Sequence, residues 1–261
     1  MSESQSLTSI LADQVNQVSD GIRHSLERHV TLMTTKPTPS EETQKHITKR
    51  VPPSQLQKYL TVEMAIALLA LEISDLGTRI SHYQHIERYR EHFKAPDKTM
   101  RAAFVMHTHI LRGSEIYVIM ERCEDWLKFF YALALDLDLG PTQVAKKLQS
   151  RFKKEFARHL RERHRIVHAH ERPSLVSRMV GVPPEDLDDP DFAKVYVATV
   201  NMLAGVLHKV IGDQVGGKSA EEALQAINVR RLEAVDRECF TMWSIFLDHI
   251  NGLIDTKKLL K

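Results

Sequence analysis

Residues 7–22 read LTSILADQVNQVSDGI, and the apolar side chains in this stretch recur every three or four positions. That spacing aligns them along one side of an α-helix and leaves the opposite side polar. The same period continues through most of the 261-residue chain, and no segment shows the strict alternation and β-branched content of a strand. We therefore predict an all-α fold, a bundle of long antiparallel helices with an N-terminal helical arm.

Prolines and glycines mark where the predicted helices end. Four prolines lie between positions 34 and 53 among many Ser, Thr and Lys residues, and they predict a linker or loop. The predicted organisation is therefore an N-terminal helix and proline-containing linker over 1–53, followed by a helical bundle over 54–261. Within the bundle the predicted helices cover about 54–93, 98–139, 142–171, 191–212 and 219–257. Several of these exceed the usual helix length, so we expect some of them to kink or split.

The composition is that of a soluble globular protein, with 43% hydrophobic and 27% charged residues. The two cysteines, Cys123 and Cys239, exclude a disulfide framework and a four-cysteine zinc site. The N-terminus lacks the charged start and apolar run of a secretory signal, and the most apolar stretch, 64–71, is too short to cross a bilayer. We expect a cytoplasmic protein with reduced cysteines and no membrane partner.

Positive charge is concentrated in one segment, although the whole chain has a formal net charge of only +2. Residues 142–172 contain ten Lys or Arg and three Glu, whereas residues 180–193 contain five acids and no base. A local field of this kind attracts phosphate groups even in a nearly neutral protein. The segment is therefore either a solvated helix face or a basic helix that binds nucleic acid or an acidic protein partner.

The end of the basic segment reads RERHRIVHAH, residues 161–170, in which four residues separate Arg163 from His168. An Arg, then a polar residue, then a His after four to six intervening residues is the signature of the HEPN superfamily, and the segment resembles it. His164 occupies the polar position, where the family most often has Asn. HEPN proteins are helical bundles, and many are ribonucleases of toxin–antitoxin, abortive-infection and CRISPR systems.

The resemblance implies a metal-independent endoribonuclease in a defence or toxin role, which cleaves RNA through the 2′-hydroxyl and leaves a 2′,3′-cyclic phosphate. Arg163 would hold the phosphate, and His168 would act as acid or base. In the family two motifs face each other in one composite site, which implies a homodimer. The family's systems also imply an antitoxin or another regulatory partner, and neither a cofactor nor a metal is expected.

Helical geometry places Arg163 near the middle of an apolar stripe, with His159 and His170 beside it. Such an arginine needs a buried acid as partner, a route to solvent or a bound phosphate. His168 lies about 140° round the helix from Arg163, whereas His170 shares the side of Arg163. Either the helix is kinked or ends near the motif and His168 is the partner of Arg163, as the resemblance implies, or His170 is the partner. The stripe consists of Leu148, Phe152, Phe156, Leu160 and Val167.

Five further basic residues are predicted to bind the RNA backbone: Arg158, Arg161, Arg165, Lys153 and Lys154. His164 and His170 are predicted as supporting or alternative catalytic residues. Metal binding by His164 and His168 is disfavoured, because their surroundings are strongly cationic and the chain has no HExxH sequence. The alternative function is a non-catalytic helical module that binds nucleic acid or an acidic protein through the basic helix 142–172.

Overall fold

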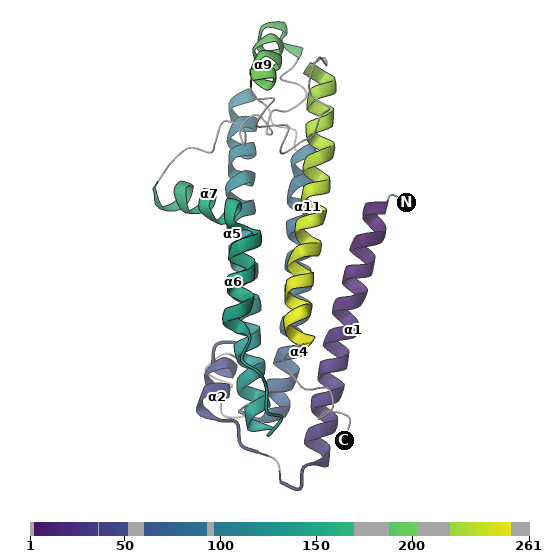
Figure 1. Cartoon of the computed structure of the whole chain (residues 1–261), viewed down its shortest axis with the longest axis vertical. Coiled ribbons are helices and arrows are strands. Elements are labelled where there is room, and N and C mark those ends of the chain that lie inside the picture. The colour runs from purple at the N-terminus through teal and green to yellow at the C-terminus, as the bar shows by residue number, and fades with distance from the viewer. Residues whose placement is uncertain are drawn as a thin grey trace. The chain divides into compact units, whose positions relative to one another are not determined.

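The computed structural model describes residues 3–35, 37–51, 60–92, 97–169, 188–202 and 220–251 (Figure 1). Within these ranges it has eight α-helices and no strand, which confirms the predicted all-α fold. No helix in the same ranges is both long enough and apolar enough to span a membrane. The helices are α1 (Glu3–Leu32), α2 (Glu41–Thr48), α4 (Val62–His92), α5 (Lys98–Asp136), α6 (Ala145–Glu155), α7 (Ala157–His168), α9 (Pro190–Met202) and α11 (Ala220–Asn251).

The chain divides into two compact units, and each long helix except α1 contributes to both. The first unit takes its residues from Met1–Ser81, Val118–Phe156 and Phe240–Lys261. The second takes its residues from His82–Tyr117 and Ala157–Cys239. Helix α6 therefore belongs to the first unit, and α7 belongs to the second.

The core of the first unit is built from antiparallel helices. The hydroxyl of Ser19 in α1 donates to the carbonyl of Ala70 in α4 over 3.1 Å. Further along, a Cβ on Gly77 would lie 3.2 Å from Val15, so residue numbers rise along α4 as they fall along α1. The indole Nε1 of Trp126 in α5 donates to the carbonyl of Leu69 over 2.9 Å. The two contacts between α1 and α4 confirm antiparallel packing for this pair of helices.

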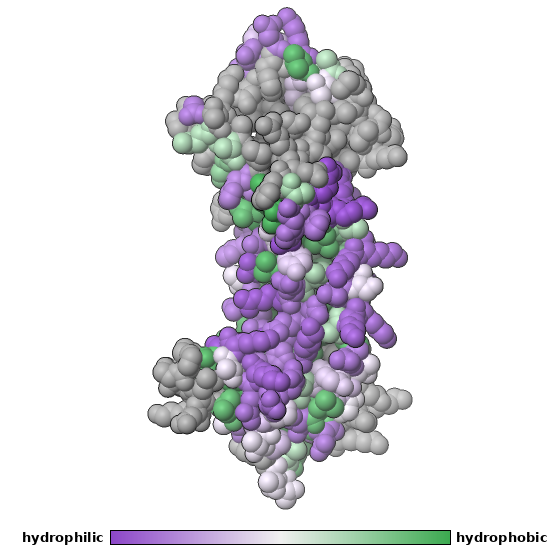
Figure 2. Space-filling model, turned by 90° about the vertical axis from the view of Figure 1, so that its left-hand side faces the viewer, coloured by the Kyte–Doolittle hydropathy of each residue, from purple (hydrophilic) through white to green (hydrophobic). Residues whose placement is uncertain are grey.

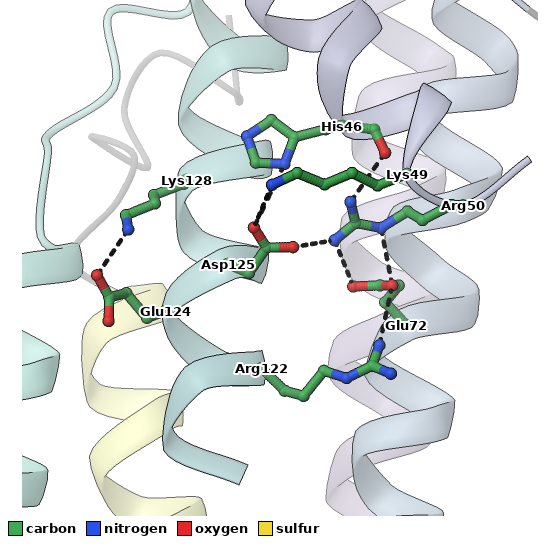
Figure 3. Close-up of polar contacts among 8 residues, drawn as sticks. All are labelled: His46, Lys49, Arg50, Glu72, Arg122, Glu124, Asp125 and Lys128. Atoms are coloured by element: carbon green, nitrogen blue, oxygen red, sulfur yellow. Dashed lines mark hydrogen bonds and ion pairs between the residues drawn. The ribbon is translucent and has the colours of Figure 1, made fainter. Parts of the chain in front are cut away.

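An ion-pair network anchors the short helix α2 to α4 and α5 (Figure 3). The guanidinium of Arg50 lies 2.7 Å from a carboxylate oxygen of Glu72 and 2.5 Å from one of Asp125. It also donates to the carbonyl of His46 over 2.8 Å and lies 4.8 Å from the centre of the Phe129 ring. Burial alone would raise the pKa of Asp125, but the hydrogen bond and charge of Arg50 lower it below its ordinary value. Arg50 is thus the centre of the network.

The segment 34–53 was predicted to be a linker or loop, but it contains helix α2. The hydroxyl of Ser40 accepts a hydrogen bond from the backbone N–H of Thr43 and caps the helix. Glu41 and Glu42 follow in the first turn, where negative charge is favoured. Ile47 is fully buried, so the helix also has an apolar anchor. The four prolines of the segment all lie outside α2.

The helix predicted over 142–171 is split into two, because the backbone breaks at Phe156. This residue has φ −101° and ψ 20°, and its N–H still bonds to the carbonyl of Phe152. Both aromatic rings are buried, with centroids 5.6 Å apart. The predicted apolar stripe holds from Leu148 to Phe156, whereas Val167 is 37% exposed. Two shorter helices, α6 and α7, therefore replace one long basic helix.

Both cysteines are buried, and neither is in a disulfide. Burial raises the pKa of the Cys123 thiol and of the Cys239 thiol well above the ordinary value. Their thiols are therefore protonated at neutral pH.

Replacing Arg50 with Ala should lower the free energy of unfolding by about 3 kcal/mol, because it leaves Glu72 and Asp125 without their main counter-charge. Urea denaturation followed by circular dichroism would measure the change. Lys45→Ala is the control, since Lys45 is exposed and pairs only with exposed acids of its own helix. A loss no larger than that of the control would contradict the central role of Arg50.

Candidate nucleic-acid interface

Helix α7 packs against α5 in the second unit at a glycine. A Cβ added to Gly113 would lie 3.2 Å from the Cβ of Arg163 and 3.5 Å from the carbonyl oxygen of His159. The absence of a side chain at Gly113 thus lets the backbones of α5 and α7 approach closely. This contact defines the inner side of α7, on which His159 and Arg163 lie.

The inner side of α7 is anchored by a largely buried carboxylate of α11, whose side chain is 15% exposed. Glu238 Oε1 lies 3.1 Å from Nε2 of His159, and Glu238 Oε2 lies 2.6 Å from a guanidinium nitrogen of Arg112. The hydroxyl of Tyr83 donates to Glu238 and accepts from Nε of Arg112 over 2.9 Å. Four helices, α4, α5, α7 and α11, therefore meet at one carboxylate.

The cluster stabilises the ionised form of Glu238. Burial alone would raise the pKa of this carboxyl, but Arg112 and His159 lower it to about 2. Burial is also the main cause that raises the pKa of Tyr83 well above its ordinary value. The tyrosine hydroxyl consequently acts as a donor at neutral pH, and the carboxylate accepts.

Arg163 reaches an aromatic ring rather than an acid. Its guanidinium carbon lies 4.1 Å from the centroid of the Tyr117 ring, within the range of a cation–π interaction. The side chain is half-buried, and its Nε has no hydrogen-bond partner in the described part of the chain. Arg163 therefore lies on the inner side of the helix, as its place in the helical period predicts, but the group it contacts there is Tyr117.

The opposite side of α7 presents five exposed side chains in an arc of about 120°, given 100° per residue. The rings of His164 and His168, one turn apart, have centroids 5.0 Å apart and an interplanar angle of 43°. We call these five residues the basic face of α7: Arg158, Arg161, His164, Arg165 and His168.

The structure brings together some of the predicted site residues and separates others. The two members of the HEPN-like motif have different surroundings, because Arg163 lies on Tyr117 while His168 is exposed beside His164. Helix α7 extends to His168, so no break in it lies between the two. Lys153 and Lys154 are exposed on α6, in the first unit. His170 lies outside the described residues.

Sequence reasoning misses the residues that hold α7 in place. Gly113 carries the one local signal, because an isolated glycine inside a helical pattern often marks a close backbone approach. The other residues carry no such signal, because they come from distant parts of the sequence. Tyr117 and Glu238 contact α7 directly, whereas Tyr83 and Arg112 contact Glu238. No group of three His, Cys, Asp or Glu side chains suited to a metal ion occurs among the described residues.

No family model, no curated protein and no solved structure matches the chain.

Replacing Glu238 with Gln should remove a pH-dependent part of the stability. The carboxyl has an ordinary pKa of 4.5 and a pKa of about 2 in the fold, so its ionised form stabilises the fold above pH 4.5. This contribution, about 3 kcal/mol, should disappear as the pH falls from 4.5 towards 2. Urea denaturation across that pH range would measure it as the difference between wild type and variant.

The control for this measurement is Glu121→Gln, which removes an exposed carboxylate from α5. Its difference from wild type should stay nearly constant with pH. If Glu238→Gln behaved in the same way, the cluster would not anchor α7 electrostatically.

Proposed function

We propose that this chain binds RNA through the basic face of α7. The observation that carries the proposal is the orientation of the helix. His159 and Arg163 contact Glu238 and Tyr117 on the inner side of α7, and the five residues of the basic face are exposed together on the opposite side. A helix that keeps five basic or imidazole groups on one exposed arc concentrates positive potential there.

The chemistry of this face suits a phosphodiester chain. Arginine binds phosphate oxygens with two parallel hydrogen bonds. Arg158, Arg161 and Arg165 follow one another along the helix over about 10 Å, given 1.5 Å per residue. The imidazoles of His164 and His168 lie beside them and are able to stack on bases or bond to 2′-hydroxyls. Among polyanions the resemblance to HEPN proteins favours RNA.

Metal-independent cleavage of that RNA is the second candidate, and the exposed histidine pair favours it. One imidazole would accept the proton of a 2′-hydroxyl as the 2′-oxygen attacks phosphorus. The other would protonate the leaving 5′-oxygen, giving a 2′,3′-cyclic phosphate and a 5′-hydroxyl. His164 and His168 are close enough to serve one phosphodiester, with arginines beside them for its oxygens.

The HEPN resemblance assigns the cleavage differently, to Arg163 and His168. Because these two residues have different surroundings within one chain, a site that uses both would combine motifs from two protomers of a homodimer. A toxin or defence role, and an antitoxin as partner, belong to the same proposal and rest on the resemblance.

Removing three arginines of the face should weaken RNA binding strongly. We expect the triple variant Arg158→Gln, Arg161→Gln, Arg165→Gln to reduce the slope of log K against log salt by about 2, since each phosphate that is no longer neutralised lowers it by about 0.7. Fluorescence anisotropy with a labelled single-stranded RNA at several salt concentrations would measure it.

The matched control removes three exposed or partly exposed arginines of the first unit that lie outside α6, namely Arg23→Gln, Arg28→Gln and Arg122→Gln. This variant should bind RNA nearly as wild type does. Equal losses in the two triple variants would mean that net charge alone, and not the basic face, drives binding.

Cleavage should survive excess EDTA and disappear in His168→Ala. An RNA cleavage assay with His164→Ala and Arg163→Lys beside it separates the two assignments. Loss with His164→Ala supports the exposed pair, whereas loss with Arg163→Lys, which keeps the charge but not the planar fork, supports a phosphate contact by Arg163. If the folded wild type bound RNA without cutting it, the cleavage proposal would be wrong and only the RNA-binding function would remain.

A further inference from the structure

Helix α6 has a second cationic surface, and its orientation is fixed by the core of the first unit. Ala145, Leu148 and Phe152 are buried on one side of the helix. Phe152 has no exposed surface and packs on Phe156. The helix therefore cannot rotate without removing this apolar side from the core. The side chains on the opposite side of α6 are therefore exposed to solvent.

The side opposite these apolar residues holds four lysines in an arc of about 120°, with Ser150 between them. All four are exposed, and along the helix they extend over about 12 Å. We call Lys146, Lys147, Lys153 and Lys154 the lysine face of α6. It shares no residue with the basic face of α7.

No acidic side chain neutralises the lysine face within the described part of the chain, and none of its four lysines forms an ion pair there. Glu155, the acid of α6 itself, is exposed but lies about 80° outside the arc of the four lysines. Two acids of neighbouring helices are engaged with other residues. Asp248 pairs with Arg151 at 2.7 Å, beside the lysine face. Glu124 accepts from Gln149 at 3.1 Å and pairs with Lys128 at 2.7 Å, the second contact being visible in Figure 3.

The chemistry of the lysine face restricts its partner. None of the large hydrophobic residues exposed in the described ranges belongs to α6, so this helix has no exposed apolar side to insert into a bilayer. Figure 2 shows a mainly hydrophilic surface with only scattered hydrophobic residues among those it colours. Lysine ammonium groups are hydrated point charges on flexible stems, which contact phosphates without the fixed geometry that base recognition needs.

We infer that the lysine face of α6 binds the phosphodiester backbone of RNA without base preference, as a surface separate from the basic face of α7. The inference rests on the proposed RNA binding and adds a second contact to it. The break at Phe156 is the reason that the two surfaces are distinct, because α6 is fixed in the first unit and α7 in the second. Two linked surfaces on one chain raise the overall affinity for a long RNA above that of either alone.

The test compares lysine-face variants in the full chain. The double variants Lys146→Gln, Lys147→Gln and Lys153→Gln, Lys154→Gln, and the quadruple variant that combines them, would be titrated with a labelled RNA and with a base-scrambled RNA of the same length. We expect the slope of log K against log salt to fall by about 0.7 for each lysine removed, equally for both RNAs. The control, Lys45→Gln with Lys128→Gln, removes exposed lysines that already have acidic partners.

Three results would overturn the inference. If the quadruple variant bound RNA as the control does while the α7 triple variant lost binding, the lysine face would be excluded and the proposed function would stand. A loss confined to one of the two RNAs would show base recognition instead. If wild type bound neither RNA but its lysines were needed to bind vesicles of phosphatidylserine, the partner would be a membrane, and the proposed function would fail as well.

Discussion

The carboxylate of Glu238 is the group on which the described packing of α7 depends. It accepts a hydrogen bond from Tyr83, pairs with Arg112 and contacts His159, so one charge links α4, α5, α7 and α11. A largely buried carboxylate that loses its partners destabilises the fold, so these groups hold one another in one arrangement. The orientation of α7 follows from it, because His159 and Arg163 occupy the inner side and the other basic residues turn outward.

The long helices could be predicted from the sequence because two independent signals agree. The apolar period and the flanking Pro and Gly place a helix over 98–139, and α5 covers Lys98–Asp136. The position of the break at Phe156 could not be predicted from the sequence. The apolar spacing continues across this residue, although the backbone leaves the helical conformation there. The prolines on either side of α2 led to the prediction of a linker instead of a helix. Ser40 followed by two glutamates is nevertheless a local signal for a helix start.

In the candidate site, too, features set by the local sequence could be predicted, whereas contacts with distant parts of the chain could not. Charge and helical period predict where the basic residues lie and that Arg163 faces inward, as it does against Gly113. The period cannot show that an aromatic ring, Tyr117, receives it, because that ring comes from another helix. Motif spacing alone pairs Arg163 with His168, whereas the helix gives them different surroundings within one protomer. Arg163 docks α7, and His168 lies with the exposed face.

The burial of both cysteines has a practical consequence. Reagents such as maleimides react with thiolates at accessible sites, and Cys123 and Cys239 offer neither the charge nor the access. The two native cysteines should therefore not react when the folded protein is labelled with a thiol reagent. A cysteine introduced on the exposed side of α6 or α7 would be the single reactive thiol of the molecule, so a fluorophore or cross-linker could be attached to either helix without first replacing a native residue.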